Sequence, residues 1–435
     1  MRRRTLLAAT AAGALTGGLA TACGGPSQAR PGQTVLRFWS WVPGIENAVD
    51  LWNSQGRDTF VNLEFTPAGG SGTYAKMYAA VRGGRGAPDV AQVEYQELPG
   101  FALENGLVEV GPLGMTDRAS EFVDWQLAMC TFSDRIYAVP QASGPMGLYY
   151  RADILDEVGL QPPTTWDEFA AAAETVRSSG PDRYLVAFPP QNAAWFGALA
   201  WQAGAQWFGV EDGTWTVGVA DDASRRVAEY WDDLRRNDLI SVQPDFASRW
   251  YNDLQLGRLV TWPSAQWGGA LLASNAGDSA GAWRVAPLPQ WNAGEMASGN
   301  WGGSSTAILK GCQHPQAAAE FALWLNTDPE SIDLLIAGGY GWPAIRNGLE
   351  GTALDAPDPL LGGQNGNREV FAVADQNIDS DWQWGPTTAN TYAHINDAFA
   401  GVVAGQGTLV EALERAQEQT VEDIEDKGLT VESNS

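Results

Sequence analysis

The chain has 435 residues, of which 44% are hydrophobic and 18% charged, which is typical of a globular protein of two or three domains. Its 52 acidic residues against 26 Lys and Arg give a net charge of −26, which argues against nucleic-acid binding. His314 and His394 are the only two histidines, so a His-based metal site or a Ser-His-Asp triad is disfavoured. We expect no catalytic residue, metal ion or cofactor.

The N-terminus has the features of an export signal. Three arginines at positions 2–4 precede an uncharged stretch rich in Ala and Leu, so residues 1–22 are predicted to be a signal peptide. The sequence LATAC at residues 19–23 resembles a bacterial lipobox, which would make Cys23 the lipidated first residue and residues 23–32 a flexible tether. Ordinary secretion is the alternative, and the paired arginines leave the twin-arginine route open.

Two further cysteines lie in the body of the chain. Export would place Cys130 and Cys312 in an oxidising compartment, so we expect a disulfide between them. Two buried free thiols are the alternative.

Apolar stretches alternate with helical patterns from residue 35 onward. This alternation predicts βαβ units and a mostly parallel sheet. The pattern Thr165-Trp166-Asp167-Glu168 predicts a capped helix start, and Thr408 with Glu411 predicts another. The predicted strands are 35–39, 60–66, 89–93, 136–140, 186–188, 259–262, 284–286 and 304–309. The predicted helices are 45–52, 73–82, 96–105, 165–176, 195–202, 315–326 and 408–427.

Several stretches, in order, resemble one protein family. They include APDV at 87–90, YAVP at 137–140, GLYYRADIL at 147–155, PPTTWDEF at 162–169, GRLV at 257–260 before Trp267, and Gly302-Gly303. Together they are similar to the extracellular solute-binding proteins of ABC importers, in the carbohydrate-binding cluster that includes maltodextrin-binding proteins. The resemblance covers about residues 34–427.

The resemblance implies an α/β, two-lobed periplasmic-binding-protein-like fold with a ligand cleft and a hinge between the lobes. Lobe one would comprise residues 33–142 plus 303–340, and lobe two residues 143–302 plus 341–430. The implied function is capture of a sugar or oligosaccharide by lobe closure and its delivery to the transmembrane subunits of an ABC permease. We expect a monomer, lipid-anchored to the outer face of the cytoplasmic membrane, that performs no chemistry on its ligand.

Tryptophan is the residue type that suits this function best. The chain has 20, and an indole ring packs its apolar face on the C–H face of a pyranose while its N–H can donate to a hydroxyl. We expect Trp267 and Trp301 to stack on the ligand. The full set of candidate ligand-binding residues is Trp41, Glu46, Gln92, Glu94, Trp195, Trp262, Trp267, Trp301 and Trp342.

Two alternatives remain open at this point. A secreted glycoside hydrolase would also be acidic and rich in Trp, and 52 acidic residues could supply its carboxylate pair. The same fold could also bind a solute that is not a sugar.

Overall fold

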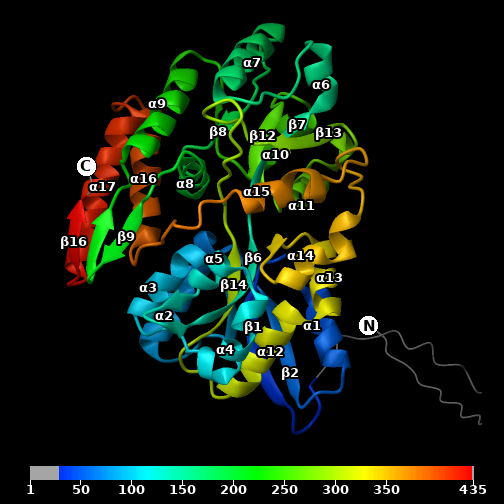
Figure 1. The fold of residues 1–435 in the computed structure, drawn as a ribbon, viewed down its shortest axis with the longest axis vertical. Coiled ribbons are helices and arrows are strands. Elements are labelled where there is room, and N and C mark those ends of the chain that lie inside the picture. Colours follow the sequence, from blue (N-terminus) through cyan, green and yellow to red (C-terminus); the bar gives the residue numbers. More distant parts are fainter. Residues whose placement is uncertain (1–28, 434–435) are drawn as a thin grey trace, which may run out of the picture.

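The computed structural model describes residues 29–433, and the predicted signal peptide and Cys23 lie outside them. Two lobes are stacked along the long axis, and the first contains a six-stranded sheet (Figure 1). In order across the sheet, its strands are β15 (Trp342–Pro343), β6 (Ala138–Ser143), β14 (Ser304–Ile308), β3 (Val90–Glu94), β1 (Thr34–Ser40) and β2 (Thr59–Phe65). Strands β1, β2, β3 and β6 run parallel, as predicted, whereas β14 and β15 are antiparallel to their neighbours.

Apolar side chains on both faces of this sheet build two separate clusters. Val90, Val139 and Ile308 pack on one face, and their chain neighbours Ala91, Ala138 and Ala307 pack on the other. The first face carries α1 (Ile45–Ser54), α4 (Met115–Arg118), α12 (Pro315–Thr327) and α13 (Pro329–Gly338). The second face carries α2 (Thr73–Gly83), α3 (Leu98–Leu103) and α5 (Asp124–Ala128).

The second lobe is built around three small sheets. Its central sheet places β7 (Met146–Arg151) between β12 (Thr261–Ala265) and β13 (Trp283–Pro287). The smaller sheets are β8 (Ala187–Phe188) with β11 (Ser241–Val242), and β9 (Phe208–Glu211) with β10 (Thr214–Val217) and β16 (Thr430–Ser433). The helices are α6 (Ala152–Glu157), α7 (Trp166–Ser179), α8 (Ala193–Gln202), α9 (Asp222–Arg236), α10 (Ser248–Gln255), α11 (Gly268–Asn275), α15 (Ala372–Gln376), α16 (Thr388–Val403) and α17 (Leu409–Asp426).

Both predicted helix caps are present. The Thr165 hydroxyl accepts the Glu168 backbone N–H at 3.1 Å, and this bond begins α7. At α17, Thr408 and Glu411 form a complete capping box. Local side-chain chemistry therefore fixes these helix starts, as the sequence indicates. None of the helices within residues 29–433 is long and apolar enough to span a bilayer.

Two of the segments that join the lobes are bonded to each other. The Trp301 N–H donates to the Gly144 carbonyl at 2.8 Å, and the Gly144 N–H donates to Asn300 Oδ1 at 2.7 Å. A Cβ at position 144 would lie 2.0 Å from the Trp301 carbonyl oxygen, so only glycine fits between the two crossings.

The lobe boundary expected at residues 340/341 is corrected at one point. The short strand β15 pairs Trp342 with Ser143 and Pro343 with Ala142, at the edge of the first sheet. These residues were expected in lobe two. Strand β6 would otherwise be the edge of the first sheet, so residues 342 and 343 pair with it before the chain enters lobe two.

The expected Cys130–Cys312 disulfide is also corrected, because both cysteines are free thiols. Strands β6 and β14 are antiparallel neighbours, and along the chain Cys130 comes before β6 and Cys312 after β14. Cys130, however, is buried in the cluster on one face of the sheet, and Cys312 packs against the cluster on the other. The sheet therefore lies between the two sulfur atoms, whereas a disulfide requires them to be at bonding distance from each other.

Candidate ligand-binding site

An aromatic cluster lies beside the segment that joins the lobes and is the candidate ligand-facing wall of the second lobe. Its members are Phe246, Trp250, Trp262, Trp267 and Trp301. The Trp267 and Trp301 rings lie 4.7 Å apart, and the Trp262 ring lies 6.2 and 6.1 Å from them. Trp262 and Trp301 are each only 4% exposed, whereas Trp267 is partly exposed. Trp267 is therefore the indole available to a ligand, with Trp262 and Trp301 supporting it from behind.

Hydrogen bonding fixes the orientation of the Trp267 ring. Its Nε1–H donates to the Trp301 carbonyl oxygen at 2.9 Å. Trp301 is the residue whose N–H donates to Gly144 where the two joining segments meet. Gly302 and Gly303 follow it with φ of +80° and +99°, a backbone region that favours glycine. The Trp267 ring is thus held against the segment that joins the lobes.

The candidate wall of the first lobe lies at the carboxyl ends of β1 and β3. Trp41 follows β1 and meets the Tyr74 ring edge-on at 5.7 Å. The Tyr74 hydroxyl donates to Glu94 Oε2 at 3.0 Å and accepts the Glu94 backbone N–H at 2.9 Å. A Cβ at Gly302 would lie 3.5 Å from Trp267 Nε1 and 3.9 Å from Glu94 Oε1, so both walls meet at this glycine.

Gln92 positions Trp41. Its Oε1 accepts the Ser40 hydroxyl at 2.8 Å and the Trp41 backbone N–H at 3.1 Å, and its Nε2 donates to Ser304 Oγ at 3.0 Å. Gln92 is 2% exposed. These bonds use its amide inside the protein, so it fixes the backbone of Trp41 instead of facing a ligand.

A second carboxyl group, Glu97, lies close to Glu94. Burial raises the pKa of Glu97 to about 8, and the neighbouring Glu94 carboxylate adds to this rise. Burial also raises the pKa of Glu94, against the hydrogen bond from Tyr74. The Tyr78 hydroxyl donates to Glu97 Oε2 at 3.4 Å. Burial raises the pKa of Tyr392, on α16 of the other lobe, and both carboxylates add to this rise. This acidic group therefore sits where the two lobes approach each other.

The second lobe supplies a carboxylate of its own next to the aromatic cluster. Asn192 Nδ2 donates to Asp245 Oδ2 at 2.5 Å, while Asn192 Oδ1 caps α8 by accepting the Trp195 N–H. Burial raises the pKa of Asp245 to about 6. Among residues 29–433, no Lys or Arg forms an ion pair with Asp245, Glu94 or Glu97. The site thus combines flat apolar rings with hydrogen-bond acceptors and suits a polyhydroxylated ligand without negative charge.

Three predicted ligand-binding residues lie elsewhere. Trp195 is 1% exposed, donates to the Pro263 carbonyl at 3.0 Å and packs 4.9 Å from Trp231, because every residue of the apolar helix α8 except Ala194 is buried. Trp342 is 2% exposed beside Asp375. Glu46 is exposed on α1 and, within residues 29–433, forms no hydrogen bond or ion pair with the site residues. The first two are core residues and the third is a surface residue.

Sequence reasoning missed several residues of this site. Tyr74 and Tyr78 are four apart on α2, so helical spacing could have indicated a shared face. Glu97 comes three residues after Glu94, which was predicted and ends β3. No comparable signal marks Phe246 or Asp245, which lie in the loop between β11 and α10.

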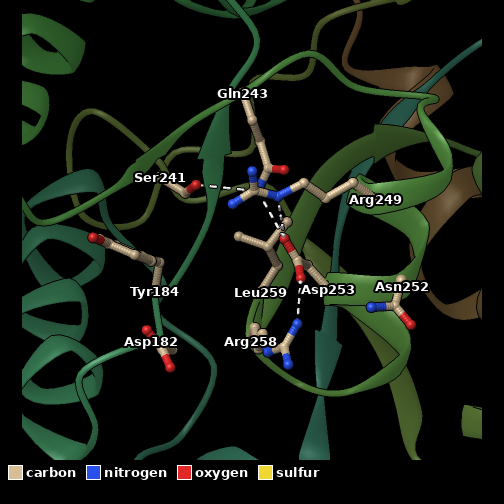
Figure 2. Close-up of a pocket in the computed structure, with 9 residues that line it drawn as sticks. All are labelled: Asp182, Tyr184, Ser241, Gln243, Arg249, Asn252, Asp253, Arg258 and Leu259. Atoms are coloured by element: carbon tan, nitrogen blue, oxygen red, sulfur yellow. Dashed lines mark hydrogen bonds and ion pairs between the residues drawn. The ribbon is translucent and has the colours of Figure 1, made fainter.

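Two cavities lie outside this site. One, of about 530 Å³, is lined mainly by small residues of α11, α13 and the segments 353–361 and 366–371. The other, of about 360 Å³, is shown in Figure 2, where Arg249 and Arg258 converge on Asp253. Gln243 Nε2 also donates to Asp253 at 3.3 Å. The charges in the second cavity are therefore neutralised within the protein.

Known proteins resemble the chain over nearly its whole length. An arabinooligosaccharide-binding protein of Halalkalibacterium halodurans is 24% identical over 412 residues, covering 89% of each chain. A lactose-binding protein of Rhizobium radiobacter is 23% identical over 353 residues, covering 76% of this chain and 79% of the relative.

Solved structures show the same fold. An ABC transporter associated binding protein from B. animalis subsp. lactis, in complex with β-1,6-galactobiose, has a TM-score of 0.84 at 24% identity and covers 92% of this chain and all of its own. A galacto-N-biose/lacto-N-biose I-binding protein from Bifidobacterium longum, in complex with lacto-N-biose, has a TM-score of 0.81 at 26% identity, covering 93% and 100%. The expected two-lobed fold is confirmed. Residues 40–331 match the bacterial extracellular solute-binding proteins, and the chain belongs to this family.

Proposed function

We propose that this protein is the oligosaccharide-binding component of an ABC importer. The observation that carries the proposal is the pairing of aromatic rings with carboxylates across two lobes: Trp267 and Phe246 on one side, Trp41 and Glu94 on the other. Rings pack against the C–H faces of sugars, and carboxylates accept their hydroxyl hydrogens. The sugar-binding names of the relatives support the same ligand class.

Binding would be coupled to lobe closure. A ligand that contacts both walls stabilises only the state in which they face each other, so its binding energy shifts the lobes toward closure. The lobes already meet in this structure, where the Trp125 ring of α5 lies 6.2 Å from that of Trp201 on α8. The closed form is then the one delivered to the permease subunits, with the sugar unchanged.

A calorimetric screen tests the proposal. The full chain without its signal peptide is titrated with lactose, β-1,6-galactobiose, lacto-N-biose and an arabinooligosaccharide, with sodium galacturonate as an anionic control. We expect at least one neutral sugar to bind with micromolar affinity or better and galacturonate to bind none. New reducing ends after long incubation would instead favour a glycoside hydrolase. The absence of binding to every neutral sugar of the screen would refute the proposal.

We also propose that Cys23 carries a lipid that holds the protein at the outer face of the cytoplasmic membrane. The lipobox-like sequence at residues 19–23 supports this, and residues 23–32 would tether the first lobe, which begins with β1 at Thr34. The protein would act there as a monomer beside the permease.

A further inference from the structure

The loop between β11 and α10 contains an unusual backbone conformation. Within residues 29–433, six residues other than glycine have positive φ: Asn105, Ser133, Asp134, Asp212, Asp238 and Phe246. The first five are Asn, Asp or Ser, of which Asn and Asp tolerate this region best because their short polar side chains bond locally. Phe246, with φ +58°, is the only bulky residue in the set. A bulky side chain in this region is strained, and such strain clusters at functional sites.

Core packing does not account for this conformation. Phe246 is 41% exposed, although it is one of the large apolar residues of the chain. Its ring lies 5.8 Å from Trp250, 6.1 Å from Trp262, 6.4 Å from Trp267 and 5.9 Å from Trp301. The ring is therefore supported from behind by the whole aromatic cluster while much of its surface stays open.

The residue before it is a carboxylate held in place. Asp245 accepts the Asn192 Nδ2–H at 2.5 Å, and Asn192 is itself fixed as the cap of α8. The sign of φ at residue 246 decides on which side of the backbone its side chain leaves. The positive φ thus sets the ring against the tryptophans, one residue from a fixed hydrogen-bond acceptor.

From this geometry we infer that Phe246 is the main stacking platform for a pyranose ring of the ligand and that Asp245 accepts hydroxyls of the same ring. The inference rests on the proposed function and deepens it, since it names the residue pair that binds one sugar unit. Trp267 then borders the same unit from the side of the crossing segment. The loop retains a strained backbone because a relaxed one would turn the ring away from the tryptophans.

Four variants test this inference: Phe246→Ala, Phe246→Asn, Phe246→Tyr and, as control, Leu256→Ala, which removes an exposed apolar side chain at the end of the neighbouring helix α10. The probe is whichever of lactose, β-1,6-galactobiose, lacto-N-biose and the arabinooligosaccharide the wild type binds most tightly by calorimetry. We expect Phe246→Ala and Phe246→Asn each to weaken binding at least tenfold, and Phe246→Tyr and the control to stay within threefold of the wild type.

The melting temperatures of the variants distinguish the backbone strain at residue 246 from the stacking of its ring on the ligand. Both Ala and Asn remove the ring, but Asn tolerates positive φ better, so Phe246→Asn should melt above Phe246→Ala without ligand. Affinities of both variants within twofold of the wild type would overturn the platform, and the reverse melting order would overturn the strain argument. A wild type that binds none of the four neutral sugars of the screen overturns the proposed function and this inference together. Binding that does not depend on residue 246 overturns the inference alone.

Discussion

The buried carboxyl group of Glu97 should make the stability of the ligand-free protein depend on pH. Its side chain is 6% exposed, and its pKa is raised from an ordinary value of 4.5 to about 8. The folded state therefore holds a proton that the unfolded state releases between these two values. The contribution of this group to the free energy of unfolding is largest below pH 4.5 and falls as the pH rises toward 8.

The magnitude follows from the size of the shift. One pKa unit corresponds to about 1.4 kcal/mol, so the interval from pH 5 to pH 7.5 should remove about 3 kcal/mol of stability through this group. In Glu97→Gln, a neutral amide of the same shape replaces the carboxyl group, and this contribution disappears. The wild type should therefore lose about 3 kcal/mol more than the variant over this interval.

Urea unfolding followed by tryptophan fluorescence, at several pH values in this range, measures the difference. Because the two chains differ at one residue, the contributions of titrating groups that do not interact with Glu97 cancel in the comparison. Glu46→Gln, on the exposed face of α1, is the matched control and should follow the wild type. If Glu97→Gln and the wild type lose stability in parallel from pH 5 to 7.5, Glu97 is ionised throughout and the reasoning from its burial is wrong.

Further expectations concern the tryptophans and the cysteines. Trp267→Ala should weaken sugar binding about thirtyfold, as for a hot spot of about 2 kcal/mol, with a melting temperature near that of the wild type. Trp195→Ala should instead cost about 3–5 kcal/mol of stability because it opens a cavity in the core; unchanged stability would contradict its burial. Mass mapping under non-reducing conditions should recover Cys130 as a free thiol, and a peptide linked to Cys312 would refute this. Cys23→Ala should release the protein from membrane fractions, so unchanged retention would exclude the lipid anchor.

Local sequence chemistry predicted most of the framework. Strands β1, β2 and β3 were found from short apolar stretches, and α7 and α17 from their Thr caps, because these signals act within a few residues. The lobe division was harder to place. Trp342 and Pro343 join the first sheet through pairing with β6, about 200 residues earlier in the chain, and no local pattern carries that information.

The motifs from APDV to Gly302-Gly303, in their order along the chain, were enough to identify the family and to predict two lobes. Together they cover strands, helix starts and a crossing segment of both lobes. Only the tertiary structure decided which tryptophans face the site. Trp195 and Trp267 both follow strand-like segments, but nearly all of helix α8 is buried, whereas Trp267, just before α11, is partly exposed. The cysteines show the same limit: the order of the strands was predictable, but the face of the sheet on which each thiol packs was not. Burial depends on which elements pack together, and this is set by contacts between residues distant in the chain.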